Sequence, residues 1–588
     1  MKNYIIILIG ALCVGLLFPV NMVVEPYLQN ATPHSMHILW ETDSDSPSIV
    51  EWGMYVFLTE TTYGSSFSNY GNSKIHTVEL TNLEPDTRYY YRVVVGDYES
   101  YSDLHDFITP PDPSSEASFR IIAMSDMQRD GSNPNKFNEV IHDGVIDYIT
   151  EEHSNDLAAE LAMVLITGDL VVTGTSYYQW QDHFFEPSED LFSHVPLYPV
   201  FGNHEQNTDY FIKYFHLPDN GTPGYEEHWY YTDYSNLRVI GLDSNSGYQI
   251  DAQLIWLETV LQDACYNDNI DFVFAQLHHP HKSELWTPGE NNYTGDVIER
   301  MENFSDECGK PSIHFFGHTH GYSRGQSQNH DHLWVNVATA GGAIDYWGEW
   351  PQADYDEFTV TQDEWGFVLL EVEAGTDPQF TLKRISRGDD YEPMDNVLRD
   401  EFTIRMNNSA PVTPHSVYPI GDEVPPDLTW LWASEYADPD NDEHGFSQWQ
   451  VSTDCDDFLN VTYNRVTEAI NDKQHFPILR IADGEFQFLL GQNEFNLRKP
   501  LHKLFIHTVR QIFDIVIGRE FELPQGIEIE GIPARFAETV SISLIYIDNG
   551  SVNFSPNLKG NVGIVGPTIT SNLLKIFLKS LVISERTF

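Results

Sequence analysis

The chain has 588 residues, too many for one ordinary hydrophobic core, so we expect several domains. Hydrophobic residues make up 41% of it and aromatic residues 13%, which is typical of a globular protein rather than a disordered one. The formal net charge of −58 argues against nucleic acid or an anionic membrane surface as a partner, because both would be repelled. We interpret the excess acids as a solvated surface.

Residues 1–21 are predicted to be an export signal. Lys2 precedes an apolar run over residues 4–20, and the first acidic residue is Glu25. The run is near the shortest length that spans a bilayer and lacks an obvious small-residue cleavage site, so an uncleaved anchor is the alternative. We therefore expect a secreted or extracytoplasmic protein, either free or membrane-anchored by this segment.

Residues 22–111 are predicted to form a β-sandwich. Residues 35–40, 49–52 and 89–95 alternate apolar and polar side chains, and turn residues separate them. Residues 82–91 resemble the corner of fibronectin type III modules. Together with residues 25–29 and Trp40, this segment is similar to the N-terminal domain of purple acid phosphatases.

Residues 116–390 are predicted to form an α/β domain, because short apolar runs alternate there with segments of helical period. The runs cover residues 119–124, 161–167, 195–201, 237–242, 272–277 and 313–316. Residues 137–150 and 250–265 can supply helices between them. Residues 367–372 and 380–384 read as two last strands.

Five of these runs end in polar clusters. The clusters are Ser125-Asp126-Met127-Gln128, Gly168-Asp169-Leu170, Gly202-Asn203-His204-Glu205, Leu277-His278-His279-Pro280 and Gly317-His318-Thr319-His320. Each alone is an ordinary turn or surface pattern. Buried parallel strands read as unbroken apolar runs, and ligands bind beyond their carboxyl ends. Five such ends side by side would direct these side chains into one crevice.

The order of these clusters resembles the calcineurin-like metallophosphoesterase superfamily, and with the preceding β domain it is similar to purple-acid-phosphatase-like enzymes. The resemblance covers about residues 22–390 and implies an α/β sandwich of the αββα type. It also implies ligand roles: Asp126 and His320 for a first metal, Asn203, His278 and His318 for a second, and Asp169 bridging both. His204 would contact the substrate phosphate or protonate the leaving oxygen.

The residue types fit this chemistry. Mixed nitrogen and oxygen ligands suit zinc, manganese or iron, and two divalent ions can clamp the attacking and leaving oxygens of a phosphate ester. We therefore expect an exported dinuclear-metal phosphoesterase that cleaves phosphate mono- or diesters by attack of a metal-bound hydroxide. The alternative is a non-catalytic secreted binding or adhesion protein with a degenerate metal domain; the nearly complete ligand set favours the enzyme.

Two positions depart from the family pattern. Many members of the superfamily have histidine where Gln128 stands, and an amide is a weaker, neutral ligand for the first metal. Purple acid phosphatases have tyrosine three residues after the bridging aspartate, where this chain has Val172. The first departure predicts weaker binding of the first metal, or a site that relies on waters, and the missing tyrosine favours divalent metals over a purple ferric centre.

Several assignments keep an alternative. His279 can replace His278 as ligand. Arg324 can bind a substrate phosphate bidentately, or it can pair with one of the many acids. His314 is interpreted as structural, and residues 330–332 as an exposed loop. Residues 345–350 are aromatic and can line the cleft or pack in the core.

The cysteines allow one disulfide. Cys265 and Cys308 each precede an apolar run, at residues 271–277 and 312–316. If these runs are neighbouring parallel strands, both cysteines lie at one edge of the sheet, and a disulfide would suit an exported protein. Two free buried thiols are the alternative.

The rest of the chain differs in charge. Residues 405–460 read as a possible β-sandwich fragment, whereas residues 461–588 contain equal numbers of acids and bases, so the whole net charge lies before them. In the latter segment Arg480, followed by Asp483-Gly484-Glu485, weakly resembles GT-D-type glycosyltransferases; a plain turn is the alternative. We leave the fold of this tail uncertain and assign it no activity.

Overall fold

The structure is a computed structural model that describes residues 19–418 except 97, 99, 206 and 207, then residues 432–440, and after these only separate strands. The chain divides into two compact units, residues 1–417 with 433–446 and residues 418–432 with 447–588. The described part contains no helix that is long and apolar enough to cross a membrane. Most of the predicted export segment, residues 1–18, lies outside the described residues.

The N-terminal domain is a β-sandwich, as predicted. One sheet has the order β1-β2-β6-β5, and the other has the order β4-β3-β7-β8 with β9 also paired to β7. The strands are β1 (Met22–Thr32), β2 (Ser35–Thr42), β3 (Ile49–Gly53), β4 (Glu60–Tyr63), β5 (Ser65–Ser68), β6 (Lys74–Thr81), β7 (Arg88–Val95), β8 (Ser100–Tyr101) and β9 (His105–Ile108). Alternate side chains such as Ile38, Trp40, Tyr91 and Val93 form its core.

The second domain contains two further sheets. A six-stranded sheet has the order β12-β11-β10-β20-β21-β22, and a seven-stranded sheet has the order β13-β14-β15-β16-β18-β17-β19. Their strands are β10 (Phe119–Met124), β11 (Met163–Ile166), β12 (Leu197–Pro199), β13 (Tyr230–Tyr234), β14 (Leu237–Gly241), β15 (Phe272–Gln276), β16 (Ser312–Phe316), β17 (Tyr322–Gln326), β18 (His332–Val337), β19 (Phe358–Gln362), β20 (Trp365–Glu373), β21 (Gln379–Gly388) and β22 (Pro393–Arg405).

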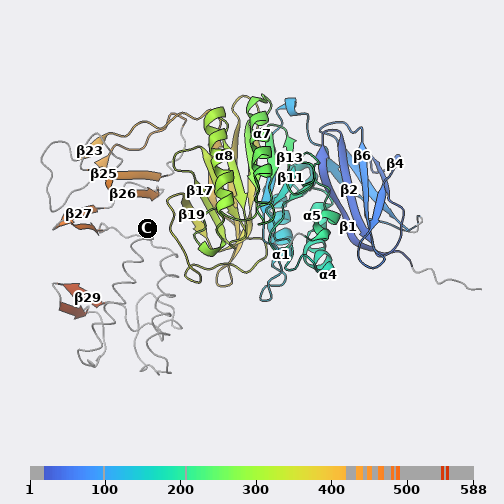
Figure 1. Cartoon of the computed structure of the whole chain (residues 1–588), viewed down its shortest axis with the longest axis horizontal. Coiled ribbons are helices and arrows are strands. Elements are labelled where there is room, and N and C mark those ends of the chain that lie inside the picture. The colour runs from blue at the N-terminus through green and yellow to red at the C-terminus, as the bar shows by residue number, and fades with distance from the viewer. Residues whose placement is uncertain are drawn as a thin grey trace, which may run out of the picture. The chain divides into compact units, whose positions relative to one another are not determined.

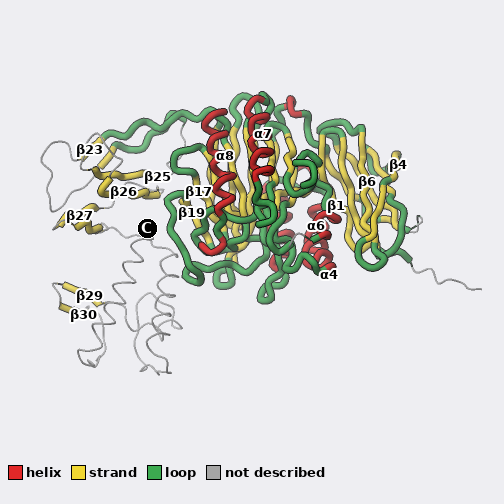
Figure 2. Tube along the Cα trace, in the orientation of Figure 1, coloured by secondary structure: helices red, strands yellow, loops and turns green. Residues whose placement is uncertain are grey.

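Helices cover the outer faces of both sheets, which gives the expected αββα sandwich (Figure 1). Helices α7 and α8 pack on the seven-stranded sheet through one apolar cluster, and Figure 2 shows them in red over its yellow strands. Helix α8 begins after Asn291, whose side chain accepts the Tyr293 N–H, and it ends before Gly309, which adopts a left-handed conformation. The helices are η1 (Pro113–Ser115), α1 (Lys136–Glu139), η2 (Val140–Ile146), α2 (Asp147–Glu152), α3 (Leu157–Glu160), α4 (Tyr177–Gln179), η3 (Trp180–Phe185), α5 (Glu186–Phe192), α6 (Asp209–Tyr214), α7 (Asp251–Tyr266), η4 (Thr287–Gly289) and α8 (Asn292–Cys308).

The predicted apolar runs are strands, but they do not all lie side by side in one sheet. Strands β10, β11 and β12 are parallel neighbours in the six-stranded sheet, whereas β15 and β16 are parallel neighbours in the seven-stranded one. The carboxyl ends therefore meet because two sheets pack face to face. The six-stranded sheet also continues past residue 390 into β22, whose side chains are mostly exposed, so that no apolar run marks it.

The two domains of the first unit share a polar interface around Glu41, which is fully buried. The Glu41 carboxylate accepts hydrogen bonds from the hydroxyls of Tyr214, at 2.8 Å, and Tyr177, at 3.1 Å. Arg88 of β7 pairs with Asp156 of the α/β domain at 2.7 Å. These hydrogen bonds and this ion pair join the β-sandwich to the α/β domain.

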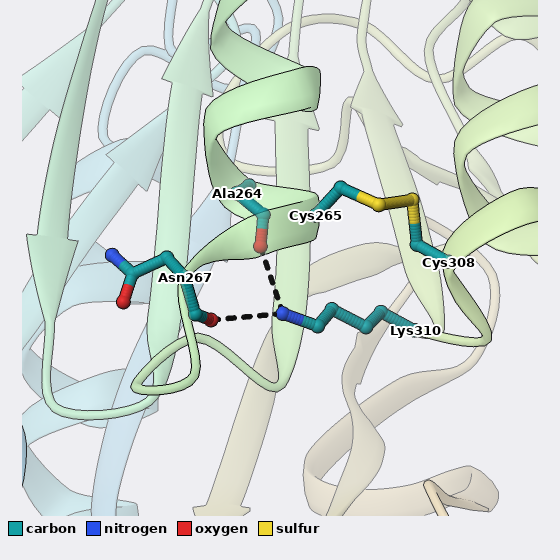
Figure 3. The surroundings of a disulfide bond; sticks show 5 residues. All are labelled: Ala264, Cys265, Asn267, Cys308 and Lys310. Carbon is teal, nitrogen blue, oxygen red and sulfur yellow. Dashed lines mark hydrogen bonds between the residues drawn. A yellow bond between two sulfur atoms is a disulfide. The ribbon is translucent and has the colours of Figure 1, made fainter.

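A disulfide joins Cys265, near the end of α7, to Cys308, at the end of α8 (Figure 3). The strands that follow these helices, β15 and β16, are parallel neighbours, which is the arrangement on which the predicted disulfide depended. Lys310 reaches back beside it and donates to the carbonyl oxygens of Ala264, at 2.8 Å, and Asn267, at 2.9 Å. The two helices are thus tied together at one end.

The elements described after β22 are short strands that pair two by two, β23 with β24, β25 with β26, β27 with β28 and β29 with β30. They are β23 (Ser416–Tyr418), β24 (Trp432–Ala433), β25 (Phe446–Ser452), β26 (Val461–Glu468), β27 (Ile478–Ala482), β28 (Glu485–Leu489), β29 (Ile545–Asp548) and β30 (Ser551–Phe554). Arg480 lies in β27 and Glu485 begins β28, while Asp483 and Gly484 of the glycosyltransferase-like motif lie outside the described residues.

Candidate metal centre

The carboxyl ends of five strands bring the predicted ligands together. Asp126 follows β10, Asp169 follows β11 and Asn203 follows β12, while His278 follows β15 and the pair His318 and His320 follows β16. Potential ligand atoms of Asp126, Asp169 and His278 all lie within 4.8 Å of one another. All three of these residues are at most 1% exposed.

One side of the cluster contains Asp126, Gln128 and His320. The His320 Nε2 lies 3.1 Å from the Asp126 Oδ1 and 2.9 Å from the Gln128 amide nitrogen. The other ring nitrogen of His320 is engaged by the Ala343 carbonyl oxygen at 2.6 Å, so that Nε2 faces the carboxylate. The Gln128 amide oxygen is buried and has no hydrogen-bond partner among the described residues. A rotation of the amide would present this oxygen as a metal ligand.

The other side contains Asp169, Asn203 and His278. The His278 Nε2 lies 2.9 Å from the Asn203 amide oxygen and 3.2 Å from the Asp169 Oδ2. The His278 Nδ1 contacts the Thr167 carbonyl oxygen at 2.8 Å, which orients the ring. A carboxylate oxygen of Asp169 thus lies within 4.8 Å of ligand atoms of both Asp126 and His278.

Glycines leave the space that this cluster occupies. A Cβ atom on Gly202 would lie 2.1 Å from the Asp169 Oδ1, and one on Gly317 would lie 2.4 Å from the Asp126 Oδ2. Only residues without a side chain fit against these carboxylates. The two glycines therefore form a cradle around the donor atoms.

Three of the predicted ligands adopt an uncommon backbone conformation. The φ angles are 58° for Asp126, 53° for Asp169 and 71° for His318. Left-handed conformations at residues other than glycine cost about 1–3 kcal/mol each and cluster at functional sites. Their coincidence here supports a functional rather than a purely structural role for the cluster.

The electrostatics of the cluster favour a positive charge at its centre. Burial alone would lower the pKa of His278 and His320, but Asp169 raises that of His278 to about 9 and Asp126 raises that of His320 to about 9. Burial alone would likewise raise the pKa of both carboxylates, yet the histidines hold each pKa below its ordinary value. The same field would stabilise a metal cation, and the nitrogen and oxygen donors fit zinc, manganese or iron.

His204 lies at the open side of the cluster, with a third of its side chain exposed. Its backbone N–H donates to the Asp169 Oδ1 at 2.9 Å, and its Nδ1 contacts the Val172 carbonyl oxygen at 2.7 Å. The remaining nitrogen, Nε2, lies 3.8 Å from the Asp169 Oδ2. His204 therefore faces the cluster without filling it.

His318 and His279 lie next to each other. The backbone N–H of His318 donates to the Asp126 carboxylate at 3.0 Å, and burial, together with the charge of His278, lowers the pKa of the His318 ring to about 4. His279 also lies within ligand distance of His278 and His318, but its Nδ1 is bonded to the Ser244 hydroxyl at 2.9 Å. Of the two alternatives, His278 is the one that faces Asn203 and Asp169.

Arg324 forms an ion pair with an acidic side chain. Such a pair was the predicted alternative to phosphate binding. The Arg324 Nε and one terminal nitrogen donate to the two oxygens of Asp400 at 2.6 and 3.0 Å, and its guanidinium lies over the Phe402 ring. A guanidinium that is held on both sides in this way, in a side chain only 12% exposed, is not presented to a ligand. We therefore leave Arg324 out of the proposed site.

Sequence reasoning gave no role to Glu205, the last residue of its cluster. This carboxylate is fully buried and accepts backbone N–H groups of Asp169, at 3.0 Å, Leu170, at 2.8 Å, and Gly202, at 2.7 Å. It thereby ties the loop that carries Asp169 to the loop that carries Asn203. Its place in a polar cluster directly after an apolar run was the available signal, but its backbone partners are not visible in a sequence.

Sequence reasoning also did not predict that Asp345 contacts one of the candidate ligands. Its carboxylate accepts the backbone N–H of His320 at 2.8 Å, and burial raises its pKa. The segment at residues 345–350 reaches the site through this carboxylate. Trp350, in the same segment, is 47% exposed.

Comparison with known families agrees with this arrangement. Residues 23–109 match the purple acid phosphatase N-terminal domain, and residues 119–322 match the calcineurin-like phosphoesterase family. Together the matched ranges contain all the predicted ligands. The chain thus contains a calcineurin-like metallophosphoesterase domain.

Relatives point to a narrower class within that superfamily. Purple acid phosphatase 1 of Ipomoea batatas is 24% identical over 44% of this chain and 54% of that relative, and an uncharacterized protein of Mycobacterium tuberculosis is 26% identical over 37% and 44%. The chain spans about half the length of the curated relatives it matches. Purple acid phosphatase PPD1 from yellow lupin shares the fold with a TM-score of 0.52 and 18% identity, over 64% of this chain and 73% of that chain. The two domains, in this order, give the chain a purple-acid-phosphatase-like architecture.

Proposed function

We propose that this protein is a metal-dependent phosphoesterase that holds two divalent ions between Asp126, Asp169, Asn203, His278, His318 and His320. The observation that carries the proposal is the convergence of Asp126, Asp169 and His278 from strands of two different sheets. Asp169, which is near both Asp126 and His278, would bridge the ions. Gln128 would add its amide oxygen on the side of His320.

The bound ions would supply charge neutralisation for the phosphate and would make water more acidic. The protein supplies the positions of the donors. Thr167 and Ala343 orient His278 and His320 through their carbonyl oxygens, and Glu205 holds the two ligand loops together. Val172 stands where purple acid phosphatases have tyrosine, so we propose zinc, manganese or ferrous iron and no coloured ferric centre.

His204 would act on the leaving group. The Val172 carbonyl accepts the proton of its Nδ1, which leaves Nε2 to face the site. With a proton on Nε2, the imidazolium can donate to the leaving oxygen of the ester or hydrogen-bond to its phosphate. Phosphate mono- and diesters both present such an oxygen.

We further propose that the protein is exported. Residues 4–20 are apolar, and the disulfide between Cys265 and Cys308 is typical of proteins from oxidising compartments. Export predicts that thiol labelling of the denatured mature protein requires prior reduction at these two cysteines. Labelling of both without reduction would contradict it.

Metal analysis combined with turnover tests the proposed activity. The purified full-length protein is assayed on p-nitrophenyl phosphate and bis-p-nitrophenyl phosphate, as isolated, after chelation, and after addition of manganese, zinc or ferrous iron. We expect about two metal ions per chain, loss of turnover on chelation and recovery on addition. Absence of metal-dependent turnover on both substrates would favour the alternative, a non-catalytic binding protein with a degenerate metal domain.

A further inference from the structure

The N-terminal β-sandwich has a hollow that the candidate metal centre does not use. The hollow has a volume of about 400 Å³, and Glu51, Phe57, Thr61, Arg92 and Leu104 are among the residues that line it. It lies over β3, β4 and β7. In Figure 1, strand β4 is on the side of the sandwich that faces away from helix α7.

The floor of the hollow is a polar row across three strands. Glu51 of β3 is paired directly with Thr61 of β4 and with Arg92 of β7, so the three side chains share one face of the sheet. Arg92 donates to one Glu51 oxygen at 2.9 and 2.6 Å. Glu51 is 21% and Arg92 38% exposed, so hydrogen-bond acceptors and donors lie side by side within reach of a ligand.

The walls of the hollow are large apolar side chains. Phe57 is 69% exposed and Leu104 is 46% exposed. The ring of Tyr55, itself 63% exposed, stacks against Phe57 with centroids 5.4 Å apart, and the Arg92 guanidinium covers the ring of Tyr101 at 4.0 Å. Exposed aromatic side chains gathered beside a hollow are typical of a binding surface rather than of a solvated one.

We propose that this hollow binds a neutral carbohydrate. A pyranose ring has an apolar C–H face, which fits Phe57, and a rim of hydroxyls, each of which donates to a carboxylate and accepts from a guanidinium, as Glu51 and Arg92 require. The volume suits a small ligand of one or two such rings. A polyanion would be repelled by the net charge of −58. A purely apolar ligand would bury the Glu51–Arg92 pair without offering hydrogen bonds to either side chain.

Binding is tested with the full-length protein on an array of neutral mono- and oligosaccharides, followed by calorimetric titration of the strongest ligand. Phe57→Ser removes a wall, and Glu51→Gln removes the negative charge and replaces one acceptor oxygen with a donor. Each is expected to weaken binding at least about tenfold, which corresponds to about 1.4 kcal/mol. Tyr266→Ser is the matched control, because Tyr266 is 79% exposed at the end of α7, and it should bind as the unaltered chain does.

Phosphate-ester turnover should be the same in all three variants, which shows that they are folded. Absence of binding to every sugar on the array would overturn the proposal, as would binding that Phe57→Ser and Glu51→Gln leave unchanged. Binding to a polylysine peptide that is lost in Glu51→Gln, without binding to any sugar, would identify a cationic partner instead and overturn it as well.

Discussion

Two pairs of histidines, in and beside the seven-stranded sheet, have opposite electrostatic environments. His278 and His320 come just after strands β15 and β16, beside the carboxylates of Asp169 and Asp126, which raise each histidine pKa to about 9 against the effect of burial. His314 lies within β16 and His332 begins β18, and both are fully buried. Burial lowers the pKa of His332 to about 3 and that of His314 well below its ordinary value.

The interior pair is bonded to neutral groups. The His314 Nδ1 lies 2.9 Å from the His332 Nε2, and the His332 Nδ1 lies 2.7 Å from the Ser312 hydroxyl. His278 is as fully buried as His314 and His332, so burial alone does not decide whether a histidine holds a positive charge. The carboxylates that follow the parallel strands make the difference, and they make the strand ends suitable for a cation.

The largest expected effect comes from removing the shared carboxylate. Asp169→Asn should abolish metal binding and reduce turnover by at least about 10³-fold, because several kcal/mol of charge stabilisation are lost. Metal content by mass spectrometry and turnover of p-nitrophenyl phosphate measure both. Asp190→Asn is the control, since the Asp190 side chain is 70% exposed. Full metal content and activity in Asp169→Asn would show that the strand-end environment does not depend on this residue.

His204→Ala should separate chemistry from metal binding. We expect metal content to stay at the level of the unaltered chain while turnover falls about 10²–10⁴-fold, the usual contribution of a proton donor in the transition state. Single-turnover measurements at saturating metal would detect the change. If the rate were unchanged, the proposed role of His204 would be wrong.

The two histidine pairs also show how far the sequence predicts the site. Apolar runs that end in Asp126, Asp169 and His278 predicted buried parallel strands, because each run has the length of a strand and its side chains become polar where the strand ends. Such a run can be recognised from neighbouring residues alone, and the folds of both domains were predicted from runs of this kind. The predicted exposed loop at residues 330–332 was wrong for His332, which begins a buried strand beside β16.

What the sequence could not predict depends on distant partners. Which runs share a sheet is set by pairing between segments far apart in the chain, so the division of the ligands between two sheets did not follow from the order of the motifs. The contacts of Glu205 are to backbone N–H groups, which every residue has. The ion pair of Arg324 with Asp400 joins strands β17 and β22, and β22 lacks an apolar run.

A smaller effect is expected at Glu205, which hydrogen-bonds to backbone N–H groups and so orients the loops that carry the metal ligands. Glu205→Gln keeps the size of the side chain and replaces one acceptor oxygen with a donor, which opposes the N–H groups of Asp169 and Gly202. Metal affinity should fall about 10–100-fold, as is usual for residues that orient ligands. Competition with a chelator measures the affinity. Unchanged affinity would mean that the loops hold their positions without this carboxylate.

The smallest effect concerns His314 and His332, the pair of histidines inside the sheet, and it tests whether their surroundings oppose a positive charge. The folded-state pKa of His332 lies below its ordinary value of 6.5, so the unfolded chain binds more protons as the pH falls. The contribution to stability is complete above about pH 6.5 and is lost as the pH falls toward 3. Between pH 7 and pH 5 the loss is about 2 kcal/mol for this one group. His314, His281 and His330 are the titratable groups around the pair, and none supplies a compensating negative charge.

The variant His332→Asn removes the titrating ring and keeps a polar side chain beside His314 and Ser312. It should unfold at a lower temperature than the unaltered chain at pH 7, because a buried hydrogen-bond network is disturbed, but its midpoint should fall less between pH 7 and pH 5. Thermal unfolding at several pH values measures both quantities, with the partly exposed His142 replaced in His142→Asn as the control. If the unfolding temperature of His332→Asn changed with pH as steeply as that of the unaltered chain, the surroundings of His314 and His332 would not oppose a positive charge. The contrast with the strand-end histidines would then have to come from the carboxylates alone.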